Sequence, residues 1–314
     1  MNSSNVLIGP GYATWNGGNF RFADGGIKAR FIKNFREISA EEFGRFDSIE
    51  TGRMIEVTGR LWSGWENLNL IIPAAATSPT IGSKLFGTAP LALVINGQDG
   101  SRLTVVNAQI TKMSNLQLSV SKELFSSDIT FTGLILPGNA PATAGSYYTY
   151  AIGEAYAAPA FAKANFAAPT IAATWAAVLP NAGVSLQNFN FKNGATVDWK
   201  WDLDYEPCTV DGYGALDAIV TGFEASCKGT PIGALEVDVA SAMAPPQALG
   251  VLESTNGGNL VLTFGAHSVT LYSAFLSAND GFAWSRKNNR IGDLTWRTTV
   301  PFAAGLATAR AAAA

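Results

Sequence analysis

One sequence pattern occurs twice in the chain. The stretch Asn19-Phe20-Arg21-Phe22-Ala23-Asp24-Gly25 returns as Asn188-Phe189-Asn190-Phe191-Lys192-Asn193-Gly194. In each copy two aromatic residues lie two positions apart, which places them on one side of a strand. The glycine that follows favours a turn, because positive φ costs it little. The pattern predicts two related β modules in one chain.

The flanking sequences repeat in the same order. Upstream, Ala13-Thr14-Trp15 recurs as Ala173-Thr174-Trp175, and downstream Asp47-Ser48-Ile49-Glu50-Thr51-Gly52 recurs as Asp217-Ala218-Ile219-Val220-Thr221-Gly222. From the first motif onward the offset between the copies drifts only from 169 to 170 and then down to 165. A period of this length is too long for a solenoid or propeller repeat, so each copy is predicted to be a whole domain.

These matches predict the domain boundaries. We expect domain 1 at residues 1–136, a linker arm at 137–172, domain 2 at 173–306 and a frayed tail at 307–314. The arm is rich in Ala, Pro, Gly and Tyr, and its aromatic residues favour packing over a free linker. Each domain is large enough to bury about 70% of the surface that its unfolded chain exposes.

The fold class predicted from the pattern of turns is all-β, with one short helix per domain. A capping box at Ser63-Gly64-Trp65-Glu66 starts a helix that Pro73 ends, and in the second copy Thr230 caps a helix whose first residue is Pro231. Short, evenly spaced strands indicate a sandwich or barrel, so we expect two tandem β-sandwich domains. The strands predicted in the first copy span residues 19–23, 27–36, 48–60, 91–96, 102–110, 115–121 and 128–135.

The composition limits the partners of the chain. Residues 1–140 carry 12 Lys or Arg against 11 Asp or Glu, and residues 165–305 carry 7 against 12. Neither half has the concentrated basic patch that phosphate binding needs, so specific DNA binding is not expected. The first residues lack a signal-peptide pattern and no apolar run reaches about 18 residues, so we expect a soluble protein that folds in the cytoplasm, without membrane partners.

The chain lacks the residues of common catalytic sites. His267 is its only histidine, which excludes His-based triads, and it has no Cys-x-x-Cys, phosphate loop or Gly-x-Ser-x-Gly motif. Cys208 and Cys227 are interpreted as small hydrophobic residues in a reducing compartment. We expect no enzyme activity, no cofactor and no metal.

The strand that begins at Asp198 has the clearest alternation. Its acids share one face, whereas Trp199, Trp201 and Leu203 lie on the other. The same face of the first copy is basic. Three interpretations stay open: a solvated strand face, a Ca²⁺ site from Asp202, Asp204 and Glu206, or a contact or shared passage in which opposite charges set the order of copies around a ring.

A long polar connection follows this strand in each copy. It spans residues 37–45 in the first copy and 206–216 in the second, and it is either an ordinary surface loop or an extended hairpin that reaches a neighbouring subunit. Together with the strand faces, these connections give our interface hypothesis. Its residues are Lys28, Arg30, Arg36, Glu41, Glu42, Asp198, Asp202, Asp204, Glu206 and Asp211.

The first copy also resembles a known family. The resemblance rests on Gly9-Pro10-Gly11-Tyr12-Ala13-Thr14-Trp15, strand 27–36, loop 39–45 leading into 47–60, helix 62–73, Leu85-Phe86-Gly87-Thr88, segment 91–113 and strand 128–134. As a pattern it resembles the tail tube (major tail) proteins of long-tailed bacteriophages. It covers nearly all of residues 5–135, and the second copy by the repeat.

The resemblance implies a structural virion protein. Its β-sandwich domains, each with a flanking helix, would form rings that stack into the hollow tail tube, through which double-stranded DNA passes into the host without sequence-specific binding. Family rings usually contain six tube domains, so we expect three two-domain chains, with six such chains as the alternative. The implied partners are the tail tip, terminator and tape-measure proteins, and the location is the virion tail after assembly in the host cytoplasm.

A different class of function also fits the sequence. Two β-sandwich modules could form a carbohydrate- or receptor-binding protein, with exposed Trp and Tyr residues as the binding platform. A tube would need a lumen that is acidic or mixed in charge, because a basic wall would hold the DNA phosphates. Self-assembly into rings would distinguish a tail tube protein from a carbohydrate- or receptor-binding protein.

Overall fold

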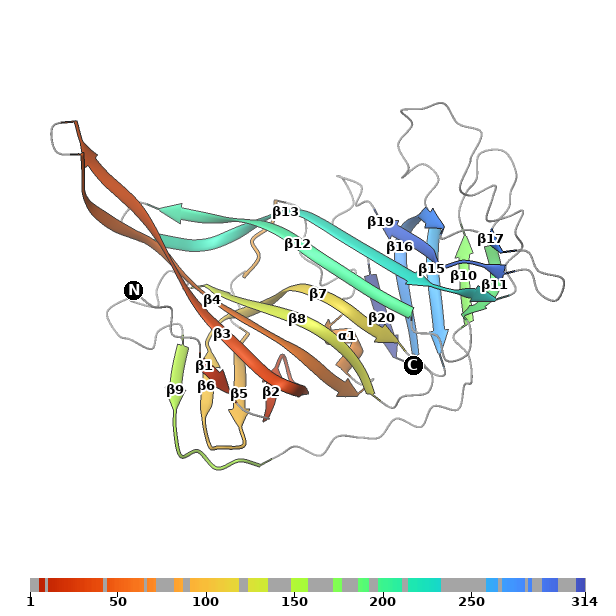
Figure 1. Cartoon of the computed structure of the whole chain (residues 1–314), viewed down its shortest axis with the longest axis horizontal. Coiled ribbons are helices and arrows are strands. Elements are labelled where there is room, and N and C mark those ends of the chain that lie inside the picture. The colour runs from red at the N-terminus through yellow and green to blue at the C-terminus, as the bar shows by residue number, and fades with distance from the viewer. Residues whose placement is uncertain are drawn as a thin grey trace.

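In the residues that the computed structural model describes, the chain is almost entirely antiparallel β-structure (Figure 1). The all-β class predicted from the sequence is confirmed. The described residues are 6–8, 11–41, 44–64, 67–71, 82–86, 91–118, 124–134, 148–157, 172–176, 186–191, 197–210, 214–232, 258–264, 267–279, 282–283, 290–298 and 309–313.

The first copy pairs β2 with β3, β3 with β4, β4 with β8 and β8 with β7. A second branch runs from β2 through β5 and β6 to β9. The elements are β1 (Val6–Ile8), β2 (Gly11–Trp15), β3 (Gly18–Ala40), β4 (Gly44–Gly64), α1 (Leu68–Ile71), β5 (Leu93–Gly97), β6 (Arg102–Val105), β7 (Ala108–Leu118), β8 (Leu124–Leu134) and β9 (Tyr148–Ala151).

The second copy repeats these pairings. β12 pairs with β13, β13 with β19, β19 with β16, β10 with β11 and β15, and β16 with β15 and β20. Its elements are β10 (Ala172–Ala176), β11 (Leu186–Phe191), β12 (Val197–Val210), β13 (Gly214–Gly229), β14 (Pro231–Ile232), β15 (Gly258–Phe264), β16 (His267–Asn279), β17 (Phe282–Ala283), β18 (Arg290–Ile291), β19 (Leu294–Thr298) and β20 (Ala309–Ala313).

The registers of the two long hairpins agree at an offset of 170. Ala29 faces Val57 in the β3–β4 hairpin, and Trp199 faces Cys227 in the β12–β13 hairpin. All four side chains are buried, because alternate residues of each strand point into the core. The sequence repeat is therefore also a repeat of strand topology and register.

A β-bulge follows the same position in both hairpins. The extra residue is Thr51 in β4 and Thr221 in β13, each next to a glycine, Gly52 opposite Asn34 and Gly222 opposite Asp204. A Cβ at Gly222 would lie 2.7 Å from Oδ2 of Asp204, so glycine leaves room for the acid. Because a bulge bends a strand and increases its twist, it marks where each hairpin departs from the regular ladder.

The core fills the space enclosed by the strands of both copies. Phe20 is fully buried and Phe22 packs against the core, as expected for the first motif. The indole N–H of Trp15 donates to the carbonyl of Ala108 at 2.9 Å, which ties β2 to β7. The Cys227 thiol is fully buried, and burial raises its pKa well above the ordinary value, in keeping with an inert cysteine.

Two helix predictions were wrong at their starts. β4 continues through Ser63 to Gly64, so Ser63 is not a helix cap, and α1 covers only Leu68–Ile71. Thr230 is not a cap either, because Pro231 begins β14 and pairs with Phe191. Pairing of these residues with neighbouring strands overrides the local cap signals. Residues 233–257 lie outside the described part of the chain.

The arm and the tail both contribute strands. Within the arm, β9 pairs with β6, and the rings of Tyr12 and Tyr156 meet edge-on with centroids 5.7 Å apart. Where the sequence predicts a frayed tail, β20 pairs with β16. Backbone pairing explains this difference, because an alanine-rich strand edge carries no side-chain signal in the sequence.

Candidate assembly interface

The two copies share one continuous sheet. Strand β7 of the first copy pairs with β12 of the second, from Leu118 opposite Val197 to Lys112 opposite Asp202. Lys112 forms an ion pair with Asp202 across this junction. We call the β7–β12 junction and the contacts beside it the seam.

A second segment of the first copy adds to the seam. The N–H groups of Gly82 and Leu85 donate to the carbonyls of Val220 and Ala218 at 2.8 and 2.7 Å. The N–H of Phe86 donates to Oδ1 of Asp217 at 3.1 Å. Residues 82–86 therefore extend the edge of β13, and Asp217, which is 7% exposed, fixes where that extension ends.

Two aromatic side chains of β12 add contacts with the first copy to the seam. The indole N–H of Trp201 donates to the carbonyl of Ile71 at the end of α1, at 3.1 Å. The hydroxyl of Tyr205 lies 3.3 Å from that of Thr132 in β8, and burial raises the pKa of this tyrosine. The seam thus combines backbone pairing, an ion pair and buried aromatic contacts.

Several positions of the first copy that are equivalent to seam positions are exposed. Phe35, the counterpart of Tyr205, is 56% exposed, whereas Tyr205 packs against the core. Ser48 is exposed, whereas its counterpart Ala218 is fully buried. We call this set of exposed counterparts, with the outer edge of β3, the open side.

One hydrogen bond is repeated between the seam and the open side. The N–H of Ser48 donates to Oδ1 of Asp47 at 2.7 Å, and the N–H of Ala218 donates to Oδ1 of Asp217 at 2.7 Å. Asp217 is buried and also accepts from Phe86, whereas Asp47 is exposed. Asp47 on the open side therefore makes the same local hydrogen bond as Asp217 makes in the seam.

Register also identifies the strands that would meet at the open side. Residues 27–32 of β3 are the counterparts of residues 197–202 of β12, at an offset of 170. The counterparts of residues 112–118 of β7 are residues 278–284, at an offset of 166, which include the end of β16 and all of β17. A second chain placed by the same rule would bring residues 278–284 against residues 27–32.

The sheet has one polar face. Eight strands in the order β3, β4, β8, β7, β12, β13, β19, β16 are paired edge to edge, and their registers align the charged residues on the side away from the core. Among the side chains that the structure describes, eight cations and seven acids leave this face with little net charge. They are Arg21, Lys28, Arg30, Arg60, Lys112, Lys200, Lys228, Arg297, Glu56, Asp128, Asp198, Asp202, Asp204, Glu224 and Asp293.

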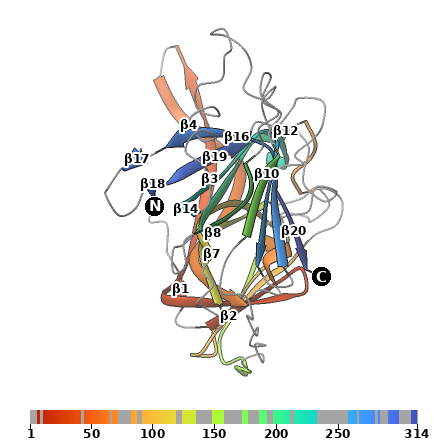
Figure 2. The same ribbon diagram turned by 90° about the vertical axis from the view of Figure 1, so that its right-hand side faces the viewer.

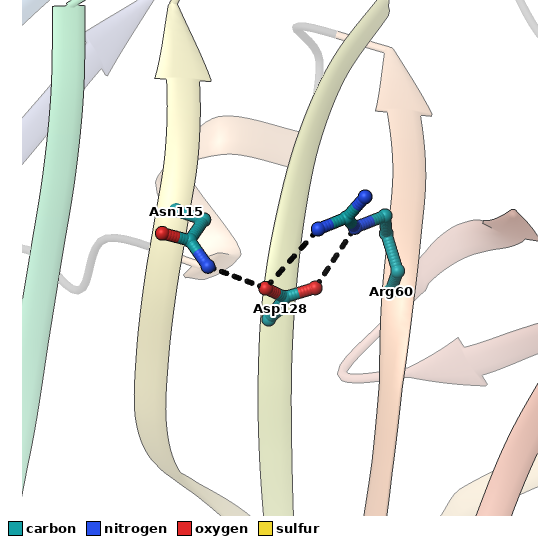
Figure 3. A network of polar contacts seen from close by, with 3 residues as sticks. All are labelled: Arg60, Asn115 and Asp128. Carbon is teal, nitrogen blue, oxygen red and sulfur yellow. Dashed lines mark hydrogen bonds and ion pairs between the residues drawn. The ribbon is translucent and has the colours of Figure 1, made fainter.

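Ion pairs connect several of these charged side chains. Asp128 accepts from Nε of Arg60 at 2.9 Å and from Nδ2 of Asn115 at 2.6 Å (Figure 3). The hydrogen bond from Arg60 is the main cause that lowers the pKa of Asp128, and the pKa of Arg60 is raised by the same contact. Further along the sheet, Lys228 lies 3.7 Å from Asp293.

The long connections are paired hairpins, not irregular loops. β3 and β4 stay paired to Ala40 opposite Gly44, and β12 and β13 to Val210 opposite Gly214. The β3–β4 hairpin extends away from the body of strands in two perpendicular views (Figures 1 and 2). Near its end Arg45 pairs with Glu37 at 2.7 Å.

The structure separates the predicted interface residues into two groups. The polar face holds Lys28, Arg30, Asp198, Asp202 and Asp204. The hairpins hold the others: Arg36 and Glu206 are exposed on their strands and Glu41 is exposed at the turn, whereas Glu42 and Asp211 lie outside the described residues. The acidic face of β12 adjoins Lys112 of β7, and β3 is its counterpart, not its partner.

Sequence reasoning missed three residues of the seam. Asp217 had a signal in the sequence, since it begins the segment that repeats the one beginning at Asp47. The alternation after Asp198 placed Trp201 opposite the acids but did not give its contact with Ile71, and Lys112 had no signal, because a partner on another element leaves no local pattern. Within the described ranges, no group of three or more His, Cys, Asp or Glu side chains is placed to hold a metal ion, so no such group includes the suggested Ca²⁺ ligands of β12.

Comparison with known proteins gives no family. No protein-family model matches the chain, and no curated protein is significantly similar to it. In the part of the chain that the structure describes, no helix has the length and apolar character needed to cross a membrane.

Proposed function

We propose that the chain is a tail tube protein of a long-tailed bacteriophage, which polymerises as stacked rings into a hollow tube. The observation that carries the proposal is the match between seam and open side. Phe35, Asp47 and Ser48 are exposed, whereas their counterparts in the second copy are covered by the first copy. A surface whose equivalent is already an interface is suited to receive another copy of the same module.

Repeating the seam between chains continues the sheet. In a ring of six tube domains, three chains would supply 24 strands, the eight strands of the polar face from each. With strands about 4.8 Å apart and tilted by about 40°, such a barrel is roughly 50 Å across at the backbone. That is wide enough to admit a DNA duplex. A ring of six two-domain chains would have twice as many strands and a far wider lumen.

The charge of the polar face suits a conduit. DNA binds basic surfaces because phosphate contacts release counterions, so a wall of net positive charge would retard a passing duplex. Among its described residues the polar face has nearly as many acids as cations, and several of them are paired with each other, as Arg60 is with Asp128. If this face lines the lumen, the genome passes it without sequence-specific contacts.

The hairpins suit contacts between rings. The end of the β3–β4 hairpin leaves the body of the molecule, and Glu37, Glu41 and Arg45 are exposed there. We propose that it contacts the adjacent ring. The remaining partners follow from the resemblance: the tail tip, terminator and tape-measure proteins, in a virion tail that is assembled in the host cytoplasm.

Electron microscopy of the purified protein tests this function. Concentrated protein should form rings or hollow tubes, and light scattering should show a rise in mass as concentration increases. The matched control is Phe35→Asp, which puts a charge on the open side at an exposed position and should keep the protein folded but dispersed. A wild-type chain that stays monomeric on concentration and binds a glycan would instead support the carbohydrate- or receptor-binding function.

A further inference from the structure

Strand β1 covers part of the open side. Val6 faces Ala29, Leu7 faces Lys28 and Ile8 faces Ile27, in an antiparallel pairing along the edge of β3 opposite β4. These three β3 residues belong to the segment that a neighbouring chain would contact. The corresponding edge of β12, residues 197–199, is occupied by β7.

β1 reproduces the end of β7 in direction and register. In the seam, Leu116 faces Trp199, Gln117 faces Asp198 and Leu118 faces Val197. At the offset of 170, these are the positions that Val6, Leu7 and Ile8 face on β3. The short sequence Val-Leu-Ile favours a strand, and Pro10 lies just beyond it. β1 therefore occupies the place of a neighbour's strand, in the same orientation.

We infer that β1 is a removable guard of the assembly edge, which keeps single chains apart until a neighbouring chain displaces it; this inference rests on the proposed function. An uncovered strand edge is a template for unwanted pairing, and proteins commonly cover such edges. β1 makes three residue pairs, whereas the seam makes five and adds the ion pair and the side-chain contacts. A neighbour that repeats the seam therefore offers β3 more contacts than β1 does.

A disulfide between β1 and β3 tests the displacement. Leu7→Cys with Lys28→Cys joins directly opposed residues, whose Cα atoms are about 4.5–5.5 Å apart in antiparallel strands, within the range for a disulfide. Cys208→Ser removes the half-buried native thiol from the background. The control staple, Thr104→Cys with Thr149→Cys, joins β6 to β9 at an opposed pair that is not on the open side.

Assembly is followed by light scattering and electron microscopy, with and without reductant. The oxidised β1–β3 staple should stay monomeric, reduction should restore assembly, and the control staple should assemble in both states. A variant that lacks residues 1–8 should begin to assemble at a several-fold lower concentration than the wild type. Assembly of the oxidised β1–β3 staple at the rate of the control would overturn the guard and leave the proposed function standing. If the reduced staple, the truncated variant and the wild type all remain monomeric, the guard and the proposed function are both wrong.

Discussion

Replacing Trp199 with alanine should lower the free energy of unfolding by about 3–5 kcal/mol, the range for loss of a buried tryptophan. Trp199 is 1% exposed and lies in β12 between Leu116 of β7 and Cys227 of β13. The cavity would therefore open in the seam, where both copies meet. Since domains of this size are stable by only about 5–15 kcal/mol, assembly should fail together with folding at mild urea concentrations. Urea unfolding followed by tryptophan fluorescence and circular dichroism measures the loss.

Two further substitutions show whether burial is the cause. Trp62 is 49% exposed, so Trp62→Ala should cost less than about 1 kcal/mol. Trp199→Phe should cost much less than Trp199→Ala, because the buried indole N–H of Trp199 has no hydrogen-bond partner among the described residues. Equal losses for Trp199→Ala and Trp62→Ala would show that the seam is not packed as described.

Shortening the β3–β4 hairpin should abolish tubes while leaving the fold and the rings intact. Ile38 and Asp47 are directly opposed, so replacing residues 39–46 with Asn-Gly closes the shortened hairpin with a favoured two-residue turn and keeps Asp47 and Ser48 of the open side. The cut removes about 10 Å of a hairpin whose described side chains are mostly exposed, so the free energy of unfolding should change by less than about 1 kcal/mol. Electron microscopy should then show separate rings in place of tubes.

A variant with a hairpin of full length shows whether tube formation depends on the length of the hairpin or on its charged residues. Glu37→Gln with Arg45→Gln removes the exposed ion pair near the hairpin end and keeps the strands. Exposed pairs contribute at most about 1 kcal/mol, so this variant should still form tubes. Tubes of normal length from the shortened chain would contradict a role for the hairpin in stacking.

The sequence predicted the repeat and the all-β class because both leave local signals. The echo of Asn19 to Gly25, and the alternation after Asp198, each depend on neighbouring residues with period two. The hairpin partners then follow at the offset of 170, with bulges after Asn34 and Asp204. Such features need no knowledge of distant contacts.

The seam could not be predicted in this way. Lys112 and Asp202 are 90 residues apart, and nothing beside either residue specifies the other. The helix starts at Ser63 and Thr230 were wrong for a related reason: a favourable local cap was outweighed by pairing with another strand. The tail shows the same effect, since β20 is specified by the edge of β16 and not by its alanines.

An interchain disulfide tests most directly the claim that one chain supplies two of the six places in a ring. At an offset of 170 for one residue and 166 for the other, Lys28 and Ala283 are the counterparts of Asp198 and Gln117, which face each other in the seam. Lys28→Cys with Ala283→Cys, in the Cys208→Ser background, should link neighbouring chains in assembled protein. The matched control, Gln117→Cys with Asp198→Cys, should form its disulfide within one chain. On a non-reducing gel we predict a ladder that ends at three chains for the first variant and monomers alone for the second. A ladder that continues to six chains, or assembled protein without interchain links, would contradict the claim.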